Sequence, residues 1–151
     1  MHRLGDAIVA SKLLEMTLVL LIDDDPLIAD IVSTSLGNGG YTVGILSNGR
    51  SALEVVEFKR PALVILDCAM PHVPGIEVLR QIRASRTCFS VPILMLTGRD
   101  RPSDRDIAMR AGATSYMSKP FEVDRLVLRV DDLIVERRQS YSRPPRRFSA
   151  R

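Results

Sequence analysis

The sequence of 151 residues lacks the features of secreted and membrane-embedded chains. Its two cysteines, Cys68 and Cys88, show neither the spacing of a metal site nor a disulfide framework. No apolar run approaches the roughly 20 residues that cross a bilayer. Charged side chains at Asp6, Lys12 and Glu15 interrupt the apolar core that a signal peptide would need. We therefore expect a reduced, cytoplasmic protein with no membrane partner.

Acidic residues are absent from the C-terminal end. Residues 137–151 hold six of the 21 basic side chains, so the preceding part carries 15 basic and 18 acidic side chains. The net charge of +3 thus comes from the end of the chain, and the mildly acidic body disfavours a nucleic-acid-binding fold. We expect an N-terminal extension over residues 1–16, one domain over 17–137 and a basic, disordered tail over 138–151.

Apolar runs and amphipathic segments alternate along the chain. Continuous apolar runs predict buried strands near residues 17–22, 41–46, 62–66, 93–96 and 114–117. Helical spacing of apolar residues predicts helices near residues 26–36, 51–59, 76–86 and 122–137, and we expect a charged helix near residues 102–111. This alternation predicts a doubly wound α/β fold, in which helices cover both faces of a five-stranded parallel sheet.

Residues with acid, hydroxyl or amino groups follow four of these strands. Asp23 and Asp24 follow the first strand, Asp67 the third, Thr97 the fourth and Lys119 the fifth. Because the carboxyl ends of parallel strands meet at one edge of a sheet, we expect a single site there. Crowded carboxylates repel one another unless a cation is present, and such oxygen ligands suit Mg²⁺. With a lysine and a threonine beside them, they predict an aspartate that becomes an aspartyl phosphate.

The sequence resembles the receiver domain of two-component response regulators over about residues 17–137. The matching motifs are LLIDDD, VILDCAMP followed by Gly75, ILMLTG and SYMSKPF. Their key residues are separated by 43, 30 and 22 positions, as in that family. The resemblance implies a flavodoxin-like (βα)5 sandwich with strand order 2-1-3-4-5, of the stand-alone type found among chemotaxis regulators.

The resemblance also implies a role for each acid of the site. Asp67 would be the phosphoacceptor. Asp24 would bind Mg²⁺ directly and Asp23 would assist through water. Asp67 and the backbone carbonyl of Ala69 would be further metal ligands. These roles describe a cofactor site for Mg²⁺ around the acceptor.

Residues of the later motifs would act on the phosphoryl group. Thr97 would donate a hydrogen bond to it, Lys119 would pair with its charge, and Gly98 would keep it accessible. The Lys119–Pro120 bond resembles the cis peptide of the family. Tyr116 matches the aromatic switch position, whose ring would turn inward as Thr97 moves toward the phosphoryl group. Tyr116 is also compatible with a static aromatic side chain.

The resemblance implies a single-domain response regulator that is a signalling phosphoacceptor and catalyses only its own phosphorylation and dephosphorylation. A sensor histidine kinase would supply the phosphoryl group. Phosphorylation would then change which target protein binds the face formed by residues 102–111, 114–117 and 122–137. The same face is the expected site of a homodimer. No DNA-binding domain is expected, because the residues after the last helix are too few to form one.

Two alternative functions remain open. The chain would act as a phosphorelay intermediate if it passed its phosphoryl group to a histidine phosphotransfer protein. It would act as an aspartate-nucleophile phosphatase if it had the second acid typical of those enzymes, but that position is Ala69. Ala69 and Arg99 resemble the positions that tune phosphate lifetime. Residues 138–151 are compatible with a solvated terminus, a docking arm or a weak polyanion binder, and Met16 is a second plausible start.

Overall fold

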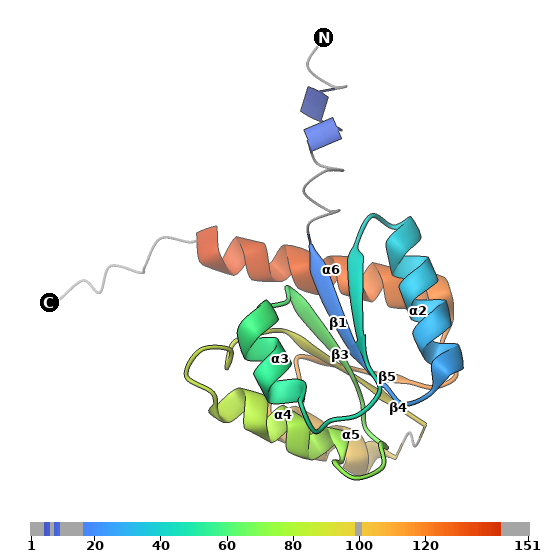
Figure 1. Ribbon diagram of the computed structural model, residues 1–151, viewed down its shortest axis with the longest axis vertical. Helices are drawn as coiled ribbons and strands as arrows, with labels where there is room; N and C mark the ends of the chain where they lie inside the picture. Colours follow the sequence, from blue (N-terminus) through green and yellow to red (C-terminus); the bar gives the residue numbers. More distant parts are fainter. Residues whose placement is uncertain (1–4, 7, 10–16, 99–100, 143–151) are drawn as a thin grey trace, which may run out of the picture.

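The computed structural model describes residues 5–6, 8–9, 17–98 and 101–142 (Figure 1). The strands are β1 (Leu18–Ile22), β2 (Thr42–Leu46), β3 (Leu63–Asp67), β4 (Ile93–Thr97) and β5 (Ser115–Ser118). The helices that alternate with them are α2 (Pro26–Asn38), α3 (Ala52–Lys59), α4 (Gly75–Ala84), α5 (Pro102–Arg110) and α6 (Val123–Ser142). The alternation predicted from the sequence is therefore confirmed. Within the described residues, no helix is both long enough and apolar enough to cross a membrane.

The five strands form one parallel sheet with the order β2-β1-β3-β4-β5, as predicted. Its register aligns the ends of the strands: Ile22 pairs with Leu66, and Thr97 pairs with Ser118. Strands in parallel register end at the same edge of the sheet. The residues that follow β1, β3, β4 and β5 are consequently brought together, although up to 96 positions separate them in the chain.

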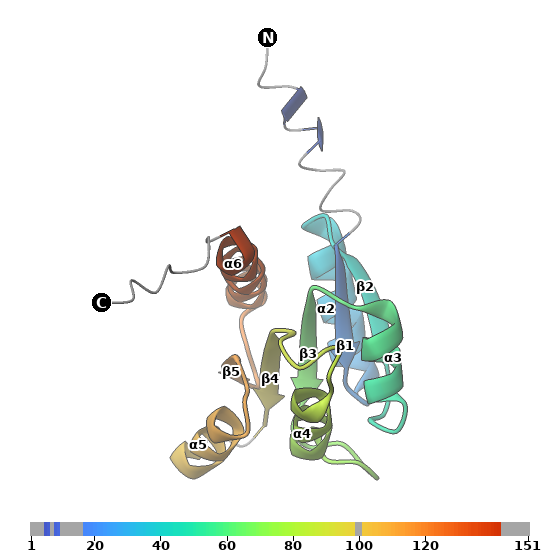
Figure 2. The same ribbon diagram turned by 90° about the vertical axis from the view of Figure 1, so that its left-hand side faces the viewer.

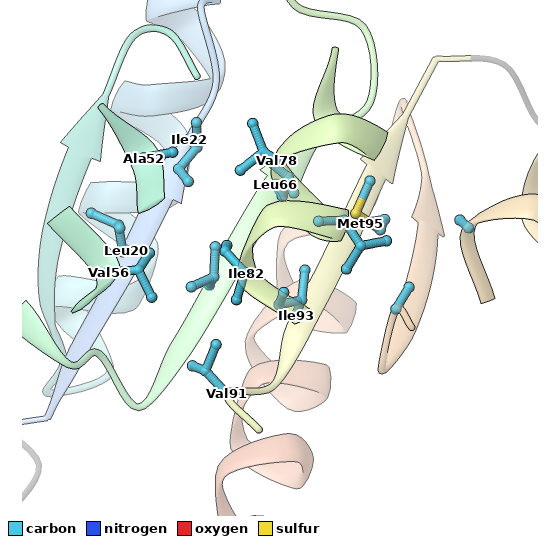
Figure 3. Packing of buried hydrophobic residues seen from close by; sticks show 14 of the residues in the cluster. Leu20, Ile22, Ala52, Val56, Leu66, Val78, Ile82, Val91, Ile93 and Met95 are labelled. Carbon is cyan, nitrogen blue, oxygen red and sulfur yellow. The ribbon is translucent and has the colours of Figure 1, made fainter. Parts of the chain in front are cut away.

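Two layers of helices cover the sheet, with α3, α4 and α5 on one face and α2 and α6 on the other (Figure 2). Neighbouring residues of a strand point to opposite faces, so Val64 and Leu66 join the first layer whereas Leu63 and Ile65 join the second. Figure 3 shows side chains of β1, β3 and β4 packed against α3 and α4 in the first layer. Each fully buried aliphatic side chain contributes about 1.5–3 kcal/mol to the free energy of unfolding.

Helix α6 is longer than predicted, because it continues to Ser142 instead of ending near residue 137. The expectation of a disordered tail is therefore wrong for residues 138–142. Tertiary contacts explain the extension: Arg137 Nη1 donates to the carbonyl oxygen of Ala62 at 3.1 Å, and Arg138 Nη2 donates to Thr17 Oγ1 at 3.3 Å. The rest of the predicted tail, and most of the predicted N-terminal extension, lie outside the described residues.

Helix α4 begins unusually close to the end of β3. The backbone N–H of Gly75 donates to the carbonyl oxygen of Cys68 at 3.1 Å. A Cβ atom at Gly75 would lie 2.0 Å from the carbonyl oxygen of Asp67, a distance that no side chain can occupy. Gly75 is thus required because backbone atoms fill the space of a side chain, and it sets the position of the loop beside Asp67.

We predict that Gly75→Ala lowers the free energy of unfolding by about 1–3 kcal/mol or more, because the loop after β3 must move. The matched control is Gly37→Ala within α2, where a Cβ atom would meet nothing within 4 Å. That control should be neutral or stabilise by up to about 1 kcal/mol. Chemical denaturation measures both values, and equal stability of Gly75→Ala and the unaltered chain would contradict the packing described above.

Candidate functional site

The carboxyl edge of the sheet collects the residues predicted to form the site. Asp23 follows β1, Asp67 and Thr97 are the last residues of β3 and β4, and Lys119 follows β5. Asp23, Asp67 and Thr97 are buried, with 1%, 4% and 3% of their surface exposed. Asp24 is exposed beside them. Three polar side chains held this far from solvent require partners of opposite charge or hydrogen-bonding groups.

Lys119 provides the positive charge at the centre of the site. Its Nζ lies 2.8 Å from Asp23 Oδ2 and 3.3 Å from Asp67 Oδ1. Burial alone would lower the pKa of Lys119, but the contacts with Asp23 and Asp67 outweigh that effect and raise the pKa above its ordinary value. The backbone N–H of Lys119 donates to the carbonyl oxygen of Thr97 at 2.6 Å. The Lys119–Pro120 bond is cis, as predicted.

Backbone N–H groups orient the two buried carboxylates. Asp25 N donates to Asp23 Oδ1 at 2.9 Å, and Ala69 N donates to Asp67 Oδ1 at 3.2 Å. Burial and the negative charge of Asp23 raise the pKa of Asp67, whereas the hydrogen bond from Ala69 and the charge of Lys119 lower it; the net direction is upward. The carboxylate of Asp67 is thus repelled by a neighbouring negative charge, and a further cation bound here would reduce that repulsion.

The three acids can hold such a cation together. Carboxylate oxygens of Asp23, Asp24 and Asp67 all lie within 4.8 Å of one another. Hard oxygen donors of high charge, with water completing the shell, are the ligands that Mg²⁺ prefers. The described residues therefore fit the predicted Mg²⁺ site. The backbone carbonyl of Ala69 as a further ligand stays a prediction.

A cavity of about 350 Å³ lies beside the site, between the ends of β3 and β4 and helix α5. Its lining residues are Cys68, Ala69, Ile76, Met95, Thr97, Asp104, Ile107, Ala108 and Tyr116. Burial raises the pKa of Cys68 to about 11, although a hydrogen bond with Thr97 lowers it. The Cys68 thiol is therefore protonated at neutral pH.

Tyr116 lies buried, with 8% of its surface exposed. It lines the cavity beside Thr97 and also a second hollow of about 480 Å³ on the outer side, next to Phe121 and Arg125. Its burial fits both the switch role and the static aromatic side chain that the sequence left open. Whether the ring moves stays a prediction.

One residue near the site was missed by sequence reasoning. Asp104 on α5 lines the cavity with Thr97, and its charge acts on the thiol of Cys68. This segment was expected to be a charged helix, and nothing in its pattern distinguished Asp104 from the exposed Asp106. Arg99, the predicted tuner of phosphate lifetime, lies outside the described residues.

Comparisons with known proteins agree on one family. The profile of the response regulator receiver domain matches residues 19–131. The chain is 40% identical over 116 residues to the response regulator MprA of Mycolicibacterium vanbaalenii. The match covers 77% of this chain and 49% of that protein. The chain is 34% identical, with the same coverage, to the probable transcriptional regulatory protein TcrX of Mycobacterium tuberculosis. The chain spans about half the length of these curated relatives, so the stand-alone organisation stays a prediction.

Solved structures show the same fold. The chemotaxis protein CheY4 of Vibrio cholerae superposes with a TM-score of 0.74 at 32% identity, over 78% of this chain and 98% of that chain. The receiver domain of the sensor histidine kinase PA1611 from Pseudomonas aeruginosa, with magnesium coordinated in its active site cleft, gives a TM-score of 0.73 at 29% identity. That match covers 79% of this chain and 98% of the other.

We predict that Mg²⁺ raises the melting temperature of the chain, because an ion bound only to the folded state stabilises it by about 2.7 kcal/mol at 100 times its dissociation constant. Asp24→Asn should weaken this effect. Without metal the same variant should melt at an equal or slightly higher temperature, because one of three repelling charges is gone.

Thermal unfolding with Mg²⁺ and with a chelator measures the effect. Asp132→Asn, an exposed acid on α6, is the control and should keep the full gain. A melting temperature of the unaltered chain that does not respond to Mg²⁺ would rule out the acidic cluster as a metal site, as would an undiminished gain in Asp24→Asn.

Proposed function

This chain belongs to the response regulator receiver domain family, and we propose that it is the Mg²⁺-dependent phosphoacceptor of a two-component phosphorelay. A sensor histidine kinase supplies the phosphoryl group and Asp67 receives it. The observation that carries this proposal is the position of Lys119, whose Nζ lies within 3.3 Å of both buried acids, Asp23 and Asp67. That arrangement places a cation beside two carboxylates in a buried site.

The hydrogen bonds of Asp67 distinguish its two oxygens. Oδ1 accepts the N–H of Ala69 and lies 3.3 Å from the ammonium group of Lys119. Oδ2 has no hydrogen-bond partner in the part of the chain that the structure describes. We therefore assign Oδ2 as the attacking atom. It forms the new bond to phosphorus while the bond from phosphorus to the imidazole nitrogen of the donor breaks, and the electron pair leaves with that nitrogen.

The groups around Asp67 act on the charge of the transferred group. Lys119 supplies a positive charge to a phosphoryl oxygen, and the Thr97 hydroxyl donates a hydrogen bond to another. Asp23, Asp24 and the Ala69 carbonyl would hold Mg²⁺ together with Asp67, and the ion, when bound, offsets negative charge on the phosphoryl oxygens. Burial of the site favours these interactions, because charges act more strongly away from water.

The proposed output is a shift between two populations of the face formed by α5, β5 and α6. Tyr116 supports this route, because it lines both the cavity beside Thr97 and the hollow on that face. A displacement of Thr97 toward the phosphoryl group changes the space available to the ring. The face would then bind a target protein or a second copy of the chain with altered affinity.

The direct test is phosphotransfer from a protein phosphorylated on histidine. A radiolabelled histidine kinase or histidine phosphotransfer domain is mixed with the full chain and Mg²⁺, and the label is followed over time. We expect label to move to the chain, and we expect Lys119→Ala to slow the transfer by about 10²–10³-fold, the usual effect of removing one stabilising donor.

Arg80→Ala, an exposed cation on α4, is the control and should transfer at the parent rate. Retention of label by several donors, with the chain folded and Mg²⁺ present, would count against the proposal. Return of label from the chain to a histidine phosphotransfer domain would identify it as a relay intermediate.

A further inference from the structure

A basic groove lies at the edge of the sheet opposite Asp67, where β1 and β3 begin. In Figure 1 this is the upper end of the two strands, near α6. The groove is open to the surface and has a volume of about 390 Å³. Its lining residues are Thr17, Leu18, Lys59, Arg60, Pro61, Ala62, Ile134, Arg137, Arg138 and Tyr141. Four of these residues are cations: Lys59 and Arg60 at the end of α3, and Arg137 and Arg138 toward the end of α6. We call this site the basic groove.

The charge of the basic groove is unbalanced. Among the residues that the structure describes, none that lines the groove is acidic. In the described ranges, ion pairs are formed by Lys119 at the other edge of the sheet, and none by the four cations of the groove. The carboxyl end of α3 supplies only about half a negative charge. One cation is therefore enough to offset the negative end of this helix. The positive charge of the other three cations favours the binding of an anion.

Hydrogen bonds to the protein hold two of the cations in place. Arg137 Nη1 donates to the carbonyl oxygens of Ala62 at 3.1 Å and of Pro61 at 3.4 Å. Arg138 Nη2 donates to Thr17 Oγ1 at 3.3 Å. Each guanidinium group has five N–H donors, so these contacts fix its position and leave other donors for a ligand. The groove thus has a preorganised wall, which reduces the entropy cost of binding.

The other two cations have no such role in the fold. Among the described residues, the side chains of Lys59 and Arg60 form no hydrogen bond and no ion pair; Lys59 Nζ lies 5.7 Å from the ring centre of Phe58. Arg60 has a positive φ of 47°, which places it at the turn between α3 and β3. Both residues are exposed at the mouth of the groove, where a ligand would reach them.

The size of the groove favours a small ligand over a nucleic acid. Its volume lies within the range of about 300–1,000 Å³ that is typical of small-molecule sites. Nucleic acids require an extended basic surface, and other arginines of α5 and α6, Arg105, Arg125 and Arg129, line a different hollow. We propose that the basic groove binds a small polyphosphate, the di- or triphosphate group of a phosphorylated metabolite. Asp67 lies at the far end of β3, so the two sites are separate.

The test is a titration of the isotope-labelled full chain with sodium tripolyphosphate in Mg²⁺-free buffer, followed by amide chemical shifts. Leu18, Ala62 and Tyr141 should shift, and the affinity should fall as salt is added. The double variant Lys59→Gln/Arg60→Gln should weaken binding at least about tenfold, the effect of losing one charge-assisted hydrogen bond. Its spectrum should keep the parent fold.

The matched control, Arg80→Gln/Arg110→Gln, removes the same charge from exposed positions on α4 and α5. Its affinity should stay within about twofold of the parent, since distant surface charges are screened by salt. If the double groove variant failed to fold, Arg60→Gln against Arg80→Gln would make the same comparison.

Three results would overturn the proposal. The first is the absence of shifts in the groove at millimolar tripolyphosphate, or shifts confined to Lys119 and Thr97. The second is an equal loss of affinity in the control pair, which would indicate attraction to net charge alone. The third is tighter binding of a single-stranded oligonucleotide to the same residues, which would replace the small polyphosphate as the occupant.

Discussion

The ammonium group of Lys119, held between the carboxylates of Asp23 and Asp67, is the contact on which the site depends. Both acids are almost completely buried, and burial together with the negative charge of Asp23 raises the pKa of Asp67. Lys119 opposes this shift from the end of β5, and its backbone N–H donates to the carbonyl oxygen of Thr97 at the end of β4. The central strands β3 and β4 are buried along their whole length, so they fix these groups with little freedom.

The two edges of the sheet carry opposite charge for a reason built into the fold. In a parallel α/β sheet each helix begins near the carboxyl edge of the strands and ends near the amino edge. Helix amino ends favour anions and helix carboxyl ends favour cations. The acids and the expected phosphoryl group lie at the first edge, and the basic groove at the second. The groove goes beyond this tendency, because its four cations exceed what the end of α3 offsets.

Much of this arrangement could be predicted from the sequence, because local pattern and sheet topology act together. Continuous apolar runs that end in Asp23, Asp67 and Thr97 indicate buried parallel strands, and parallel strands bring their ends together. The length of α6 could not be predicted, since residues 138–142 have no apolar face and depend on contacts of Arg137 and Arg138 with distant backbone and side-chain atoms. The inward position of Asp104 likewise depends on how α5 rotates against β4, which periodicity alone does not determine.

The most direct test of the account is the intact mass of the full chain after incubation with acetyl phosphate and Mg²⁺, followed by peptide mapping. We predict one added phosphoryl group on Asp67, absent from Asp67→Asn and absent when Mg²⁺ is chelated. A phosphoryl group on another residue would contradict it. An unchanged mass of the folded chain with Mg²⁺ present would also contradict it. Asp67 would then not accept a phosphoryl group although it lies beside Lys119 and the acidic cluster.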